Sequence, residues 1–257
     1  MNKIIVRDNV LEDFSSENIV ISNNSIYFLT GGDYFIEYIG SHKIKLNIAL
    51  KENITVTLFE YSSLEGLENK ITYDIREDSI LRINKFYNNI TNDDNVIINL
   101  LGENAKIKYM ASSLSKDNAK HNIIVNHLNK NTVSDIYYHI LALSKASVDV
   151  NIDSVLPKGN TNCYLNQETK IITLGDNACM VKPNMYIEED DVEAKHGSVI
   201  GTFNQRDIFY LSSRGLYYKD AINLLVKGHI LANLENGFNF KEKIIDCLNK
   251  IGGDICE

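Results

Sequence analysis

The chain has 257 residues, 44% of them hydrophobic, with a formal net charge of −8, so it is long enough and apolar enough to bury a core and is not wholly disordered. The acidic balance disfavours binding to nucleic acid or to anionic membranes, and no apolar run approaches the roughly 20 residues of a membrane span. Its four scattered cysteines do not make a disulfide framework, so we expect a reducing, cytoplasmic setting.

Short runs of alternating apolar and polar residues fill roughly the first 200 positions. They lie at residues 44–50, 54–58, 80–83, 96–101, 123–125, 136–143 and 148–152. Alternation with a period of two places apolar side chains on one face of a β-strand. The runs are separated by polar clusters typical of turns, at residues 88–89, 91–95 and 102–104. We therefore predict many short strands without helices between them.

Two architectures suit this rhythm, a β-sandwich or barrel and a β-solenoid. Hairpins in sandwiches commonly carry Asn-Gly or Asp-Gly turns, and neither dipeptide occurs before the C-terminal region. A solenoid stacks equivalent strands in parallel and tolerates asparagine at its corners. The abundance of isoleucine and asparagine fits such coils, although an AT-rich genome would produce it as well. The pattern favours the solenoid.

After Gly201 the apolar spacing becomes helical. We predict helices over residues 208–214, 220–234 and 240–251, with Gly215 ending the first and residues 252–253 ending the third. The predicted organisation is a β-core over residues 1–201 and a small helical domain over 202–257. No Pro/Gly/Ser-rich linker separates them, so we expect the helices to dock on the last strands.

Several catalytic motifs are absent from the sequence. There is no G-x-x-x-x-G-K-[ST] loop and no G-x-G-x-x-G, so this chain is predicted to bind no nucleotide by itself. There is no C-x-x-C, no H-E-x-x-H and no G-x-S-x-G. Cys163 and Cys179 lie on successive predicted strands, where a cysteine is usually a small buried hydrophobe. We predict that the chain is not an enzyme with a self-contained site.

Residues 182–228 carry a set of short motifs. They are Lys182-Pro183-Asn184, Asp190-Asp191-Val192, His196-Gly197, Ile208-Phe209-Tyr210-Leu211 and Ser213-Arg214-Gly215. Their joint spacing resembles the SufB/SufD core family of iron–sulfur cluster assembly scaffolds, and weaker matches extend over about residues 120 to 251. The resemblance implies a right-handed parallel β-helix with a C-terminal helical domain. It also implies a short form that lacks the additional N-terminal helical domain frequent in the family.

The resemblance implies a function as well: a non-catalytic scaffold subunit. Such a subunit dimerises through its β-helix with a second SufB/SufD-type chain, and its C-terminal helices bind a SufC-like ABC-type ATPase. A transient iron–sulfur cluster would form at the subunit interface, with sulfur supplied by a cysteine desulfurase. Both a SufD-like partner of a separate SufB and a homodimeric minimal scaffold fit the residues.

Three residues are candidates for cluster chemistry by this resemblance. His196 falls where SufD-like members place a histidine implicated in cluster formation, and neutral imidazole is a competent iron ligand. The alternative is a histidine that bonds a neighbouring loop. Glu168 falls where SufB-like members have a ligand cysteine, and Cys179 is a candidate for sulfur handling, with a core role as its alternative. Ala194 stands where SufD-like sequences often have cysteine, which puts a thiol-based site in doubt.

The segment after Gly201 is where the resemblance places the ATPase contact. The residues implied are Phe209, Tyr210, Arg214, Gly215 and Leu216. The alternative is structural: Phe209 would pack the helices onto the β-core and Arg214 would cap carbonyl groups.

Two other classes of function stay open from the sequence. A carbohydrate-active β-helix enzyme would need a carboxylate cluster along one groove, for which residues 188–191 and Glu193 are available. A purely structural β-solenoid would have neither bound iron nor an ATPase partner.

Overall fold

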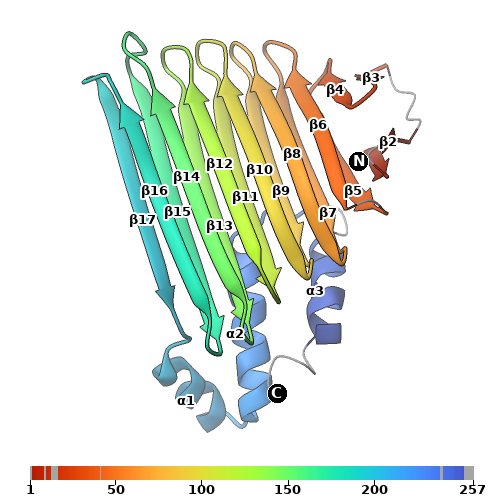
Figure 1. Cartoon of the computed structure of the whole chain (residues 1–257), viewed down its shortest axis with the longest axis vertical. Coiled ribbons are helices and arrows are strands. Elements are labelled where there is room, and N and C mark those ends of the chain that lie inside the picture. Colours follow the sequence, from red (N-terminus) through yellow and green to blue (C-terminus); the bar gives the residue numbers. More distant parts are fainter. Residues whose placement is uncertain (1, 9, 13–16, 41, 238–239, 252–257) are drawn as a thin grey trace.

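The computed structural model describes residues 2–8, 10–12, 17–40, 42–237 and 240–251. From β4 onward, successive strands alternate between two sheets, and Figure 1 shows them crossing the molecule in chain order. The strands are β1 (Asn2–Arg7), β2 (Val10–Leu11), β3 (Ile19–Ser22), β4 (Ser25–Phe28), β5 (Gly32–Ile39), β6 (Lys43–Leu50), β7 (Thr55–Ser62), β8 (Gly66–Ile75), β9 (Ile80–Tyr87), β10 (Thr91–Leu100), β11 (Lys106–Ser115), β12 (Ala119–His127), β13 (Val133–Leu143), β14 (Ser147–Leu156), β15 (Cys163–Leu174), β16 (Ala178–Ile187) and β17 (Val192–Gly201).

The two sheets are named here after their last strands. The β17 sheet has the order β17-β15-β13-β11-β9-β7-β5-β1-β2, and the β16 sheet has the order β16-β14-β12-β10-β8-β6-β4-β3. Neighbouring strands are parallel apart from the pairs β1–β2 and β3–β4. A chain that alternates between two parallel sheets is a β-solenoid, because a sandwich would be built from antiparallel hairpins. The predicted mainly-β solenoid is confirmed.

Asparagine or aspartate occupies five successive corners at which the chain passes from the β16 sheet to the β17 sheet. Asn53, Asp78, Asn104, Asn131 and Asn162 have φ between 55° and 61°. Asparagine and aspartate adopt this left-handed conformation more readily than other residues with a side chain. Their side chains also bond between coils, since Asn104 Nδ2 donates to Asp78 Oδ1 at 2.8 Å and Asn162 Nδ2 donates to Asn131 Oδ1 at 2.7 Å. Asparagine therefore stabilises these corners.

The polar run at residues 91–95 is not a turn. That prediction is wrong, because these residues begin β10. The backbone N–H of Asn95 donates to Asn69 Oδ1 at 3.1 Å, and Asn122 Nδ2 donates to Asn95 Oδ1 at 3.1 Å. Stacked amides of this kind satisfy polar side chains along a series of parallel strands. These bonds join residues of different coils. Turn propensity depends only on residues that are neighbours in the sequence, so it does not predict them.

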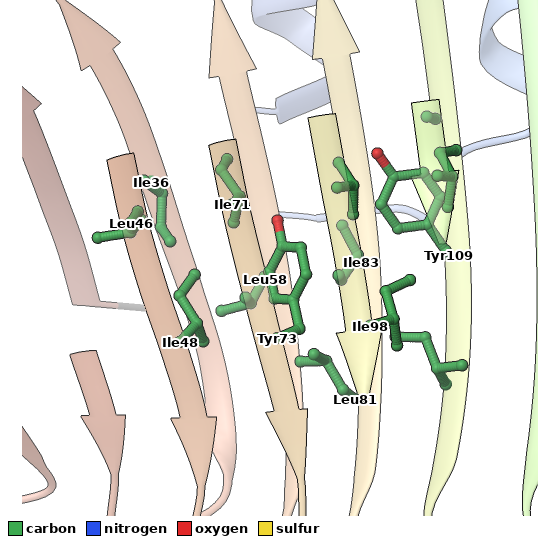
Figure 2. Packing of buried hydrophobic residues seen from close by; sticks show 14 of the residues in the cluster. Ile36, Leu46, Ile48, Leu58, Ile71, Tyr73, Leu81, Ile83, Ile98 and Tyr109 are labelled. Carbon is green, nitrogen blue, oxygen red and sulfur yellow. The ribbon is translucent and has the colours of Figure 1, made fainter. Parts of the chain in front are cut away.

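Apolar side chains from both sheets fill the space between the sheets. Figure 2 shows Ile71 and Ile98 from the β16 sheet beside Ile83 from the β17 sheet, and all three are fully buried. Each strand contributes one inward row because its side chains alternate between the two faces. Burial of one isoleucine side chain stabilises a fold by about 2 kcal/mol. The stacked isoleucine rows therefore supply much of the stability of the solenoid.

A charged cluster lies inside this apolar core. Lys85 Nζ lies 3.5 Å from Glu60 Oε2 and 3.8 Å from Asp94 Oδ1, and all three side chains are fully buried. The hydroxyl groups of Tyr38 and Tyr73 donate to the Glu60 carboxylate at 2.7 and 2.5 Å. Buried charges need such partners because they have lost their hydration.

The pKa of Asp94 reflects this surrounding. Burial alone raises it, but the positive charge of Lys85 and the His121 ring, whose Nδ1 lies 3.5 Å from Asp94 Oδ2, outweigh burial and lower the pKa of Asp94 to about 2. Asp94 is therefore ionised at neutral pH inside the core. Its contribution to stability is present above the ordinary aspartate pKa and is lost as the pH falls below about 4 toward 2.

Three helices follow the strands: α1 (Gln205–Ser213), α2 (Tyr218–Ala232) and α3 (Phe240–Ile251). Figure 1 shows α2 and α3 lying across the strands and α1 next to the end of β17. They form a second core with the outer face of the β17 sheet. It includes Phe35, Phe59, Phe86 and Leu141 from the strands and Ile222, Val226, Ile230, Phe240 and Ile244 from the helices. The middle strands of this sheet are therefore buried on both faces.

Polar contacts fix the end of α2 on the sheet. Asn233 Nδ2 donates to Ala111 O at 2.7 Å, and Ser112 Oγ donates to Ile230 O at 2.9 Å. The predicted third helix matches α3, whereas α1 and α2 begin a few residues earlier than predicted. The expected stop at residues 252–253 lies outside the described residues, and the division into two domains at residue 201 stays a prediction. Within the described part of the chain, no helix has the length and apolar character needed to cross a bilayer.

Replacing Lys85 with methionine is expected to lower the free energy of unfolding by about 3–5 kcal/mol, because Glu60 and Asp94 would stay buried without a cation. Urea unfolding followed by circular dichroism measures this change. The matched control is Lys70→Met on the exposed face of β8, where we expect a change within about 0.5 kcal/mol. Equal changes in the two variants would contradict the assigned role of the buried cluster.

Candidate functional site

The last coil of the solenoid has a free edge. Each of its two strands is paired on one side, β16 with β14 and β17 with β15. Residues 193–200 of β17 are exposed along the whole run. Unpaired backbone groups at the edge of a sheet are a ready surface for pairing with another chain. This edge is the first candidate site.

His196 lies in the middle of β17 and faces the interior of the solenoid. It is in register with Gln167 on β15, whose Nε2 donates to Ser154 Oγ of the opposite sheet at 2.8 Å. Side chains paired across parallel strands point the same way, so His196 points inward as well. It is exposed, and within the described residues no hydrogen bond joins its ring to a neighbouring loop. The imidazole is therefore accessible to a metal ion.

Glu168 lies on the opposite face of the same sheet. It follows the inward-facing Gln167, so its side chain points outward, where Lys170 Nζ lies 2.6 Å from its Oε1. The sheet separates Glu168 from His196. Within one chain the structure does not bring these two candidate ligands together.

Cys179 faces the interior, and the pKa of its thiol is higher than that of an ordinary cysteine. It pairs with the buried Val148 on β14 and packs against the apolar core. Burial raises the pKa of its thiol, an effect that the hydrogen bond with the Val148 backbone only partly offsets. The thiolate is the form that reacts with sulfur and binds metal, and it is disfavoured here.

Cys179 also lies at a different level of the coil from His196. The chain leaves β16 at Ile187 and enters β17 at Val192, so the beginning of β16 lies toward Ile200 at the far end of β17. Ile200 is four residues beyond His196, or about 13 Å along the strand. Of the residues that the structure describes, no three His, Cys, Asp or Glu side chains are grouped so that they could hold a metal ion. A metal centre at the edge would therefore need ligands from beyond these residues.

A buried hydrogen-bonded chain surrounds Cys163 at the neighbouring corner. Thr132 Oγ1 lies 3.1 Å from Cys163 Sγ and 2.8 Å from His127 Nδ1, and His127 Nε2 lies 2.9 Å from Ser134 Oγ. All four residues are buried, and burial lowers the pKa of His127 to about 4. Cys163 is thus a core residue, as predicted, and its contact with Thr132 joins two coils. A neutral His127 joins β12 to β13 within one coil. Sequence spacing alone does not show that these side chains meet.

The acidic turn between β16 and β17 has a structural role. Glu189 Oε2 accepts a hydrogen bond from the Gly159 backbone at 2.9 Å, and its Oε1 accepts one from the Asp190 backbone at 3.0 Å. These two bonds lower the pKa of Glu189. The carboxylate is therefore engaged in closing the turn, and nothing in this geometry favours the paired carboxylates of a carbohydrate-active enzyme.

The second candidate site is the exposed side of α1. Phe209 is 76% exposed and Tyr210 is 56% exposed, whereas Ile208 is buried against the core. The guanidinium of Arg214 lies 5.3 Å from the centre of the Tyr210 ring, a cation–π contact. Phe209 therefore does not pack onto the β-core, and the Arg214 side chain is stacked on an aromatic ring.

The turn after α1 adds further aromatic surface. Gly215 has φ +94°, the left-handed conformation that commonly ends a helix, and the N–H of the partly buried Leu216 donates to Leu211 O at 3.3 Å. Tyr217 and Tyr218 follow and are 82% and 62% exposed. These two tyrosines were not among the predicted site residues, although a Tyr-Tyr pair between two amphipathic helices could have indicated exposed aromatic surface there.

A cleft separates this surface from the end of the solenoid. It has a volume of about 390 Å³ and is lined by residues that include Thr173, Leu174, Phe203, Ile208, Tyr218 and Ile222. A group of exposed apolar side chains beside a cleft is typical of a protein-binding site. The helix pair therefore has the character of an interaction surface.

Comparisons with known proteins agree with this picture. Residues 69–229 match the family model described as SUF system FeS cluster assembly, SufBD core domain. The chain is 28% identical over 105 residues to the iron–sulfur cluster assembly protein SufD of Bacillus subtilis, covering 40% of this chain and 24% of that protein. It is 40% identical over 45 residues to SufD of Escherichia coli, covering 18% of this chain and 11% of that protein. The matched segments thus span a quarter or less of these relatives.

The free energy of unfolding is expected to fall as the pH drops from about 6.5 to 4. Burial lowers the pKa of His127 and of His229 to about 4 in the folded chain, whereas an unfolded histidine titrates near 6.5. The unfolded state therefore binds more protons in this window, and stability decreases as the pH falls through it. Urea unfolding at several pH values measures the slope.

The variant His127→Asn should make that slope shallower, whereas His42→Asn, at an exposed position, should keep the slope of the natural chain. If His127→Asn left the slope unchanged, the burial of His127 would not be the cause of the pH dependence of the free energy of unfolding.

Proposed function

The chain belongs to the SufBD core family of the SUF iron–sulfur cluster assembly system, and from this membership we propose that it is a non-catalytic scaffold on which a cluster is assembled. The observation that carries the proposal is the position of the match, which runs from the middle of the solenoid through the free edge to α2. The cluster is cargo in this proposal. Its sulfur comes from a cysteine desulfurase, and nucleotide chemistry belongs to a partner.

The free edge is the proposed dimerisation surface, with a second SufB/SufD-type chain as the partner. Four large apolar side chains on β16 and β17 support this, because they are exposed at the last coil where a soluble edge is usually protected by charge. They are Met180, Tyr186, Val199 and Ile200, which are between 46% and 57% exposed. Pairing along this edge would cover them.

His196 is the proposed cluster ligand of this chain. It is the central inward-facing residue of the free edge, so a partner that pairs there would meet it and supply the other ligands. Neutral imidazole binds iron well. Glu168 lies on the outer face and is not assigned to the same ligand set. Sulfur handling by Cys179 would require a thiolate, which its raised pKa disfavours.

The exposed side of α1 and the following turn are the proposed docking surface for a SufC-like ABC-type ATPase. Phe209, Tyr210 and Tyr217 supply exposed aromatic area, which is enriched in the energetic centres of protein interfaces. Arg214 is held over Tyr210, so a cationic group is presented in a defined position. Three residues separate the end of β17 from the start of α1, so a force on the helices would reach the edge strand directly.

Co-expression with a SufC-type ATPase is expected to yield a complex that Phe209→Ser weakens about tenfold or more, because truncation of a central aromatic residue commonly costs about 2 kcal/mol of binding. Affinity is measured by titration calorimetry. The matched control is Leu128→Ser, at an apolar position that is 44% exposed on the solenoid, where no loss is expected. Failure to form any complex would count against ATPase docking.

Anaerobic reconstitution of the chain with its partner subunits is expected to give a cluster absorption band that His196→Ala weakens or shifts, because a ligand is removed. The control His42→Ala removes an exposed histidine near the other end of the solenoid and should leave the band unchanged. Identical spectra for the natural chain and His196→Ala would remove His196 from the site.

A further inference from the structure

The connection between α2 and α3 contains the one Asn-Gly step of the sequence, at residues 236–237. It lies outside both helices, since α2 ends at Ala232 and α3 begins at Phe240. The Asn236 side chain is exposed, and in the part of the chain that the structure describes no hydrogen bond holds its amide. An asparagine followed by glycine is the pair most prone to spontaneous deamidation, because glycine has no side chain to shield its backbone nitrogen.

The reacting groups of this step are not held in regular structure. Deamidation needs the backbone nitrogen of Gly237 to reach the side-chain carbonyl carbon of Asn236. Among the described residues, the Gly237 N–H donates to no backbone carbonyl. Hydrogen bonding along a helix or strand would fix that nitrogen, and here this restraint is absent.

The reaction consumes one water molecule and releases ammonia. The Gly237 nitrogen forms a bond to Asn236 Cγ, the bond from Cγ to Nδ2 breaks, and Nδ2 leaves as ammonia with the proton of the Gly237 N–H. Water then opens the resulting five-membered succinimide ring at one of its two carbonyl carbons. Opening at Cγ gives aspartate with a normal backbone. Opening at the main-chain carbonyl carbon gives isoaspartate, in which the backbone runs through Cβ and Cγ.

The chain is anchored to the β17 sheet on both sides of Asn236. The N–H of Glu235 donates to Asn84 Oδ1 on β9 at 2.7 Å. Gly237 lies against the ring of Phe59 on β7, so closely that a Cβ added to the glycine would overlap the ring. Asn236 is therefore a single free residue between two fixed ones.

Gly237 also sets the position of the first turn of α3. Its carbonyl oxygen accepts a hydrogen bond from the N–H of Phe240, the first residue of the helix, at 3.2 Å. The Phe240 ring is fully buried, and its centre lies 5.4 Å from that of Phe59 and 6.3 Å from that of Phe35. Movement of Gly237 away from Phe59 would therefore disturb the start of α3.

We infer that Asn236 is a site of spontaneous deamidation, and that its isoaspartyl product releases the first turn of α3 from the β17 sheet. Isoaspartate adds one atom, or about 1.5 Å, to the backbone. The two anchors leave no slack for this length, so Gly237 is displaced from Phe59. The aspartyl product adds only a charge at an exposed position and leaves the packing intact. This inference is independent of the proposed function.

Ageing of the full chain at mildly alkaline pH, followed by peptide mapping with mass spectrometry, tests the modification. We expect aspartyl and isoaspartyl products at Asn236. The internal control is Asn118, which is also exposed but is followed by Ala119, and it should stay intact. The variant Asn236→Gln should stay unmodified at this position, because its longer side chain closes the ring far more slowly.

Hydrogen exchange tests the structural effect. In the aged natural chain, the Phe240 amide should exchange about tenfold or more faster than in the fresh chain. Freshly prepared Asn236→Asp, which has the charge without the longer backbone, should exchange like the fresh natural chain. No product at Asn236, or equal modification of Asn118, would overturn the site. Unchanged exchange in the isoaspartyl chain, or equal acceleration in aged Asn236→Gln, would overturn the release of α3.

Discussion

Parallel pairing is the constraint on which this molecule depends, because a parallel solenoid satisfies the strand backbone of every coil between its two ends. Each strand from β5 to β15 is hydrogen-bonded both to the strand of the coil before it and to the strand of the coil after it. At β16 and β17 the series stops, and a line of unpaired backbone groups is left beside the inward-facing His196. An unpaired edge of this kind is a ready surface for pairing with another chain, which is the basis of the proposed dimerisation.

The helices cover the side of the solenoid and leave its end open. Their apolar face packs on the outer surface of the β17 sheet, while the aromatic residues of α1 and its following turn face outward. The same sheet thus carries the packed helices on its flank and the free strand at its edge. In the proposed function, an ATPase bound to the helices pulls on the strand that holds His196, which connects the two candidate sites through a few residues of backbone.

Much of the fold was predictable from alternation alone, since the alternating apolar residues of β6 and β14 face a single core. β11 was harder, because its last residues are buried on both faces by the interior and by α2, so polarity does not alternate there. The candidate site was harder to predict from the sequence. That His196 faces inward and Glu168 outward depends on the register of β15 and β17, which no spacing in the sequence specifies. The buried Lys85 cluster joins strands of different coils and likewise could not be predicted from the sequence.

The central claim of the proposed function is that a second chain pairs with this one at the β17 edge, where it would meet His196. With a second copy as that chain, replacement of His196 by cysteine tests it directly, because a hydrogen-bonded antiparallel pair separates opposite Cα atoms by about 5.5 Å, within the range of a disulfide. Mild oxidation should give a covalent dimer of His196→Cys on a denaturing gel, and Lys195→Cys, whose side chain points to the other face, should give none above the natural chain. Equal cross-linking of the two variants, or none for either, would contradict the account.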